Sequence, residues 1–239
     1  MIDEKYTSAI TEEIDNAYKI ANTARSKGYD PEDTVNIPLA KNMAERVEEL
    51  VGVVIPQIVN SGAKERIKEL ESIYGKLDWR VAFKISLEAT QQKFCEFGTQ
   101  KEAFEAGVRI GLAYLTLGIV ASPLEGFVGI KFRKRKDGKD YIALMYSGPI
   151  RSAGGTAGAV SVVIADHIRR SMGYAAYDPS EKEIRRTVAE LYDYHERITN
   201  LQYLPTEKEI RFLVSNLPVQ IDGDPSEDLE VSNYKDLER

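Results

Sequence analysis

The chain has 239 residues, of which 43% are hydrophobic, and its 32 Lys and Arg against 38 Asp and Glu give a net charge of −6. This length suffices for one large core or two modest ones. No apolar run reaches the roughly 18 residues that a membrane crossing needs. The charged start does not resemble a signal peptide, and the single cysteine, Cys95, excludes an internal disulfide. We therefore expect a cytoplasmic protein without a membrane segment.

The first predicted element is a long amphipathic helix over residues 3–27, which Gly28 ends. Tyr6, Ile10 and Ile14 begin its apolar face. Acidic residues predominate in the first fifty positions and would repel phosphate, so this helix is expected to contact protein and not DNA. Tyr6, Ile10 and Ile14 are therefore predicted to contact another subunit or a second copy of the chain.

Four shorter helices are expected to follow, opening at Asn36, Ser61, Asp78 and Thr99. The last one contains Gly107 and Gly111 one turn apart, at a cost of about 1 kcal/mol each relative to alanine. Helices that dimerise in membranes share this glycine spacing, but the charges of Glu105 and Arg109 exclude a membrane span. We predict instead a central helix whose backbone packs closely against a neighbour.

The predicted fold class is α+β. Pro123, Glu125 and Gly126 mark the expected boundary between a helical region, residues 1–122, and an α+β region, residues 123–239. The second region is expected to be the smaller unit, with an antiparallel hairpin, a glycine-rich loop that leads from a strand to a helix, and further helices.

The hairpin is predicted from two strand patterns, residues 127–135 and 140–146, joined by an Asp-Gly turn. The alternation in the first strand predicts that one face carries Val128, Ile130 and Phe132. Six basic residues crowd into this stretch: Lys131, Arg133, Lys134, Arg135, Lys136 and Lys139. Such local basicity on an acidic chain fits a DNA-contacting edge, and it fits a solvated hairpin tip equally well. The residues proposed for DNA contact are Lys131, Arg133, Arg135 and Lys136.

A glycine-rich segment, residues 146–158, connects the second strand to a helix with apolar residues at helical spacing. Gly154 and Gly155 permit backbone angles closed to other residues, and Thr156 is expected to cap the helix. The segment lacks the Gly-Lys-Ser/Thr of a P-loop and the glycine spacing of a dinucleotide fingerprint. Two interpretations stay open: the glycines serve close packing, or they and Arg151 approach a phosphate at the helix N-terminus.

A short repeat follows, Tyr177-Asp-Pro-Ser-Glu-Lys-Glu183 and Tyr203-Leu-Pro-Thr-Glu-Lys-Glu209. Each copy predicts a helix start with a capping box after a proline. The simplest interpretation is that the same capping chemistry is used twice, and two copies are too few for a solenoid.

Residue patterns for catalysis are absent from the sequence. His167 and His195 are the only histidines and fall on separate predicted helices, without the cysteine or glutamate spacing of a zinc site. Asp222 and Asp224 flank one glycine and could hold a metal ion, but Asp-Gly-Asp-Pro is also an ordinary turn. We assign no catalytic, cofactor-binding or metal-binding residue.

Four segments of the second region are distinctive: Gly148-Pro-Ile-Arg-Ser-Ala-Gly-Gly-Thr156, Leu191-Tyr-Asp-Tyr-His-Glu-Arg-Ile-Thr-Asn-Leu-Gln-Tyr203, Pro205-Thr-Glu-Lys-Glu-Ile-Arg211 and Glu230-Val-Ser-Asn-Tyr-Lys-Asp-Leu237. Together they resemble the N-terminal region of the large subunit of archaeal family D DNA polymerase. The similarity is continuous from about Ser122 onward, whereas the first hundred residues resemble the family mainly in their long amphipathic helices. Because that subunit is several times longer, the chain is similar to its leading part.

The resemblance implies a complete enzyme that extends DNA from deoxynucleoside triphosphates with a divalent metal such as Mg²⁺, a nucleotidyltransferase reaction. It also implies a small subunit that bears a 3′–5′ proofreading exonuclease. The family's metal-binding aspartates belong to an Asn-Ala-Asp-Phe-Asp-Gly type of motif expected beyond Arg239. The resemblance therefore implies roles in assembly, with the small subunit or a second copy, and in support of the DNA path.

Three functions are compatible with the sequence. The first is a non-catalytic structural and interaction domain of a replicative DNA polymerase. The second is a phosphate- or nucleotide-binding enzyme that uses Gly154, Gly155 and Thr156. The third is a protein-interaction module without a role in nucleic-acid binding.

Overall fold

The computed structural model describes residues 4–29, 39–117, 126–147, 155–197 and 200–223. The chain forms two compact units, residues 1–40 and 41–239. The first unit contains α1 (Glu4–Ser26), and Gly28 ends it with a φ of +74°, as predicted. Among the described helices, none has the length and apolarity that crossing a membrane requires.

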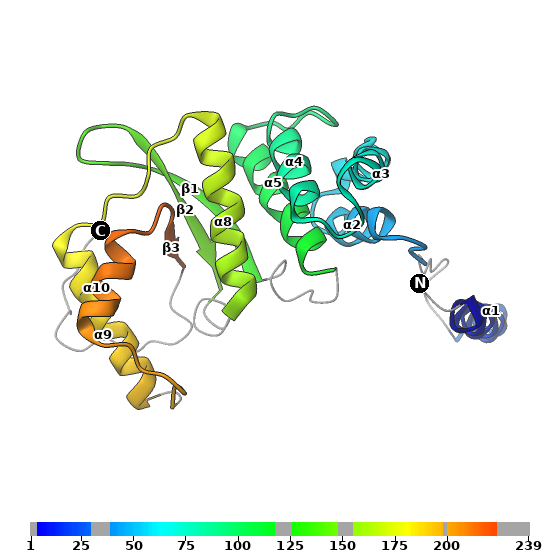
Figure 1. Cartoon of the computed structure of the whole chain (residues 1–239). Coiled ribbons are helices and arrows are strands. Elements are labelled where there is room, and N and C mark those ends of the chain that lie inside the picture. Colours follow the sequence, from blue (N-terminus) through cyan, green and yellow to red (C-terminus); the bar gives the residue numbers. More distant parts are fainter. Residues whose placement is uncertain (1–3, 30–38, 118–125, 148–154, 198–199, 224–239) are drawn as a thin grey trace. The chain divides into compact units, whose positions relative to one another are not determined.

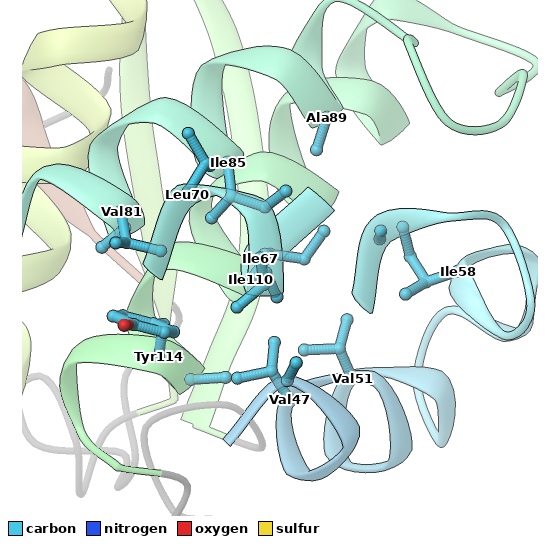
Figure 2. Packing of buried hydrophobic residues seen from close by; sticks show 14 residues of the cluster. Val47, Val51, Ile58, Ile67, Leu70, Val81, Ile85, Ala89, Ile110 and Tyr114 are labelled. Atoms are coloured by element: carbon cyan, nitrogen blue, oxygen red, sulfur yellow. The ribbon is translucent and has the colours of Figure 1, made fainter. Parts of the chain in front are cut away.

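A first core lies among four helices of the second unit. They are α2 (Met43–Gly52), α3 (Ala63–Tyr74), α4 (Trp79–Thr90) and α5 (Gln100–Leu115), and a short 3-10 helix, η1 (Pro56–Ile58), follows α2. Figure 2 shows their buried side chains pointing toward one another, with Val47 and Val51 from α2, Ile67 and Leu70 from α3, Val81 and Ile85 from α4, and Ile110 and Tyr114 from α5. The three- and four-residue spacing of these positions gives each helix one apolar face.

A three-stranded sheet and α8 (Gly155–Met172) enclose the second core. The strands β1 (Phe127–Lys134), β2 (Asp140–Tyr146) and β3 (Gln220–Asp222) lie in the order β1-β2-β3, and β2 pairs antiparallel with β1 and parallel with β3. Figure 1 shows α8 beside the hairpin and next to α4 and α5. The core joins apolar side chains of α5, the strands and α8, among them Phe104, Val108, Leu112, Ile142, Leu144, Ile164 and Ile168. The α+β prediction is confirmed.

The predicted alternation along β1 is wrong at its start. A β-bulge lies between Phe127 and Gly129, so Phe127 and Ile130 are both buried while Val128 is 61% exposed. The bulge forms where Glu105 of α5 reaches the strand, since its carboxylate accepts the backbone N–H of Ile130 at 2.8 Å. A Cβ at Gly129 would collide with that carboxylate. A contact from outside the strand thus overrides the two-residue period.

The repeated sequence forms the starts of α9 (Glu181–Arg197) and α10 (Glu207–Ser215), which pack on each other through a small core of Ile184, Val188, Ile210 and Val214. Both predicted capping boxes are confirmed, because each Glu accepts the N–H of the Ser or Thr three residues before it. The tyrosine of each copy adds a third contact: Tyr177 donates to Glu183 at 3.0 Å and Tyr203 donates to Glu209 at 2.8 Å.

Two of the four predicted helix starts need correction. The expected start at Asn36 lies outside the described residues, and α2 begins at Met43, where Asn42 accepts the N–H of Glu45 at 3.0 Å. The third helix begins after Gly62 and not at Ser61, because Gly62 takes the left-handed conformation that opens the turn. Asp78 and Thr99 are N-caps as predicted. The expected boundary between residues 122 and 123 lies outside the described residues.

The prediction of close backbone packing at Gly107 and Gly111 is confirmed. A Cβ at Gly107 would collide with the Thr90 hydroxyl of α4 and lie 2.5 Å from the Ser86 carbonyl oxygen. A Cβ at Gly111 would collide with the Ser86 hydroxyl and lie 3.3 Å from Ile164 of α8. The missing side chains therefore let α4 and α8 approach the backbone of α5.

We predict that Gly107→Ala destabilises the protein by about 1 to 3 kcal/mol, the usual cost of adding a methyl group to a filled core. Gly158→Ala is the matched control, because Gly158 also lies in a helix but has no atom within 4 Å of the position a Cβ would take. That control should be stabilising by up to about 1 kcal/mol through helix propensity. Urea unfolding of both variants measures the difference. Equal free energies of unfolding would contradict the packing argument.

Candidate nucleic-acid interface

The basic stretch lies at the tip of the β1–β2 hairpin. The backbone N–H of Arg135 donates to the Lys139 carbonyl at 2.9 Å, and Gly138 has a φ of +81°, so Asp137-Gly138 forms the predicted turn. Asp137 accepts the backbone N–H of Lys139, and this hydrogen bond lowers the pKa of the carboxyl group. The local sequence therefore suffices to shape the tip.

The Arg133 side chain links two strands of the sheet. Its guanidinium donates to Gln220 Oε1 at 2.8 Å and to Asp222 Oδ2 at 2.7 Å, so it joins β1 to β3 across the middle strand. Tyr141 of β2 donates to the same Gln220 oxygen at 3.0 Å. The Asp222 side chain is only 4% exposed, against 25% for Arg133. The arginine thus compensates a buried carboxylate.

Arg135 ties the hairpin tip to the segment after α8. It donates to the Ala176 carbonyl at 3.0 Å and lies 3.3 Å from Asp137 and 3.7 Å from Asp178. Beside it an open groove is lined by Arg135, Lys139, Asp140, Met172, Gly173, Tyr174, Ala175 and Ala176. The charge of Arg135 is therefore shared with two nearby carboxylates.

The lysines of the hairpin point to solvent. Lys134 pairs with Asp140 at 2.8 Å and Lys139 lies 3.6 Å from Asp137, both with highly exposed side chains. Lys131 and Lys136 are exposed, and neither has an acidic partner within ion-pair distance among the described residues. Of the four residues proposed for DNA contact, Arg133 and Arg135 are thus engaged within the fold, whereas Lys131 and Lys136 face outward.

The glycine-rich segment is described only in part, because Arg151 and Gly154 lie outside the described residues. Gly155 is the first residue of α8 and has a φ of +49°, a conformation that favours glycine. Thr156 is exposed and lies in the first turn of α8, so the prediction that it caps this helix is wrong.

Asp222 and His195, two of the groups considered for metal binding, have other partners. Asp222 binds Arg133, and Asp224 lies outside the described residues. His195 accepts the backbone N–H of Leu201 at 3.0 Å. Within the described residues, no three His, Cys, Asp or Glu side chains form a group that could hold a metal ion.

The predicted partner-contact residues lie along α1. Tyr6 is 62% exposed, and Ile10 and Ile14 are half-buried within this unit.

Sequence reasoning missed the role of Gln220 and Asp222 as the third strand. A three-residue strand has no recognisable period, and its parallel pairing with β2 joins segments more than seventy residues apart. A polar residue at each end of Gln220-Ile-Asp222 was the only signal available, and it is equally typical of a turn.

We predict that Asp222→Asn destabilises the protein by about 3 kcal/mol, because it leaves the Arg133 charge in the sheet without its counter-ion. Lys134→Gln is the control, since it removes an exposed ion pair that contributes at most about 1 kcal/mol. Denaturant unfolding monitored by circular dichroism compares the two. A destabilisation by Asp222→Asn no larger than that of Lys134→Gln would show that the pair contributes little.

Comparison with known proteins gives matches over nearly the whole chain. A family model described as DNA polymerase II large subunit DP2, N-terminal, matches residues 5–239. The DNA polymerase II large subunit of Nanoarchaeum equitans is 47% identical over 98% of this chain and 19% of that protein. Those of Methanosarcina barkeri and Pyrococcus furiosus are 43% and 44% identical, each over 98% of this chain and 20% and 18% of the relative. The chain spans about a fifth of the length of these relatives.

Proposed function

The chain belongs to the family of the N-terminal region of the DNA polymerase II large subunit, and from this premise we propose that it is a non-catalytic domain of a cytoplasmic replicative DNA polymerase. The match from residue 5 to residue 239 is the observation that carries the proposal. The role proposed for the domain is to assemble the enzyme and to support the path of DNA.

For the complete protein we propose the activity that the relatives' name states, DNA polymerisation. Deoxynucleoside triphosphates would be its substrates and Mg²⁺ its metal, and a small subunit with 3′–5′ exonuclease activity would be its partner. No residue of this chain is assigned to that chemistry. The engagement of Asp222 by Arg133 supports this view, because a carboxylate neutralised by an arginine is a poor metal ligand.

The hairpin is the proposed DNA contact. Its lysines project from an edge of the sheet, and lysine is suited to sequence-independent contact with phosphate because its compact charge is mobile and well hydrated. Lys131 and Lys136 are the strongest candidates of the set, since the other basic residues of the hairpin have carboxylate partners. Arg133 and Arg135 would act indirectly, by fixing the hairpin on the sheet.

We predict that changing Lys131 and Lys136 together to glutamine weakens binding to primed duplex DNA and reduces the slope of log affinity against log salt by about one to two units. The control carries Lys182→Gln and Lys208→Gln, the same charge change on exposed positions of α9 and α10. Fluorescence anisotropy at several salt concentrations measures both. Equal affinities and slopes for the two double variants would reject the hairpin as a contact. Thermal stabilisation by a nucleotide without DNA would favour the phosphate-binding enzyme instead.

The helix α1 is the proposed assembly element. It is 23 residues long, it forms a unit separate from residues 41–239, and its half-buried Ile10 and Ile14 share a face with the exposed Tyr6. Helices of this length gain most of their stability from packing an apolar face on another surface. A small subunit or a second copy of the chain would supply that surface.

We predict that Ile10→Asp with Ile14→Asp weakens association at least tenfold, because two carboxylates would have to leave water at the contact. The control adds the same charge on the polar side, with Asn16→Asp and Asn22→Asp at exposed positions. Analytical ultracentrifugation of each variant, alone and with the small subunit, measures association. Unchanged association with the helix content preserved would remove α1 from the proposed assembly surface.

A further inference from the structure

Three aromatic rings form a continuous row where α4 meets α8. Trp79 and Phe83 lie one turn apart on α4 with ring centroids 5.4 Å apart, and Phe83 meets His167 of α8 at 5.0 Å. Both contacts are edge-to-face, the arrangement that aromatic quadrupoles favour. The two helices are neighbours in Figure 1. The row therefore joins the helical layer to the helix that covers the sheet.

Trp79 is largely exposed although it is one of the largest apolar side chains. Its exposed fraction is 60%, whereas Phe83 packs partly against the first core and so fixes the base of the row. Val163 lies one turn before His167 on α8 and is 54% exposed. Neither Trp79 nor Val163 belongs to a buried core. An exposed tryptophan anchored on a rigid helix is typical of a binding site.

Basic residues follow the aromatic row. Arg80 and Lys84 lie one turn apart on α4, each next in sequence to Trp79 or Phe83, and the exposed Lys76 lies in the turn before this helix. Asp78 is the only acid between positions 76 and 84. Arg80 neutralises Asp78 at 2.8 Å and lowers the pKa of that carboxyl group to about 2. The Asp78 charge is thus compensated within the row.

On α8 the carboxylate next to His167 is also neutralised by arginine. Asp166 is bound by both Arg169 and Arg170, at 2.6 and 2.9 Å. Burial and the nearby Lys84 ammonium lower the pKa of His167, which favours its neutral imidazole. The surface consequently combines flat neutral rings with an excess of cations, on a chain whose net charge is −6.

We propose that Trp79, Phe83 and His167 form a stacking surface for single-stranded DNA, with Lys76 and Lys84 beside it for the phosphates. Unpaired bases offer the flat faces that stack on exposed aromatic rings, whereas duplex bases are hidden in their own stack. The cations favour a polyanion over an apolar protein segment, which would strip water from the lysines without neutralising them. The site lies on α4 and α8 and not on the basic hairpin. Only the choice of DNA as the ligand rests on the proposed function.

The single tryptophan of the chain makes the test direct. Titration of the 239-residue protein with a twelve-nucleotide oligo-dT should quench its tryptophan fluorescence. An oligonucleotide of equal length and charge whose sugars carry no bases should bind more weakly and leave the fluorescence unchanged. With a labelled oligo-dT, Trp79→Ala should raise the Kd between about five- and 100-fold. Lys84→Gln should reduce the salt slope by about 0.7.

Phe212→Ala is the matched control, because Phe212 is an exposed aromatic residue on α10, a different helix. It should bind oligo-dT like the parent, and all variants should keep the parent's melting temperature. Equal oligo-dT affinity of Trp79→Ala and the parent, or equal binding of the base-free oligonucleotide, would overturn the proposal. If Trp79→Ala weakens only the association with the small subunit, the surface is a protein-docking site and not a DNA-binding site. Failure of the Lys131 and Lys136 variant to affect duplex binding would reject the hairpin contact and leave this surface standing.

Discussion

The close approach of α4 and α8 to the backbone of α5 is the constraint on which the rest of the structure depends. Gly107 and Gly111 leave room for the Ser86 and Thr90 side chains on one side and for α8 on the other. Because α5 is fully buried along most of its length, its side chains enter both hydrophobic cores. The helical layer and the sheet are therefore not independent: the glycines cost helix propensity, and the tight packing of the two layers offsets that cost.

Buried polar contacts then fix where the sheet meets α5. Arg109 donates to the Phe127 carbonyl at 2.6 Å and lies over the Phe127 ring, one turn from the Glu105 that holds the β-bulge. Burial lowers the pKa of Arg109, and the charge of Glu105 opposes that shift. These contacts satisfy backbone groups of β1 on either side of the bulge and tie the hairpin to α5.

The basic stretch shows why a count of charges is a weak guide to a surface. Arg133 and Arg135 bind carboxylates and a carbonyl within the fold, a use suited to the planar guanidinium with its five donors. The lysines, whose ammonium groups are more strongly hydrated, remain in solvent. The same division appears at the aromatic row, where Arg80 neutralises Asp78 and Lys84 stays exposed. The proposed contacts with phosphate therefore fall on lysines.

Features that depend on residues close in the chain could be predicted from the sequence. They are the capping boxes at Thr99 and Thr206, the Asp-Gly turn, the amphipathic helices and the α+β class. Periodicity and capping chemistry determine them because every atom involved lies within one or two turns. The close packing at Gly107 could also be predicted from the sequence, because glycine in a helix interior costs stability and so indicates a packing constraint. Tertiary structure alone decided the burial of Arg133 against Asp222, the parallel pairing of β3, the exposure of Val128 and the alignment of Trp79 with His167. Each of these joins groups distant in the chain, and which polar group meets which is settled only when packing has brought the elements together.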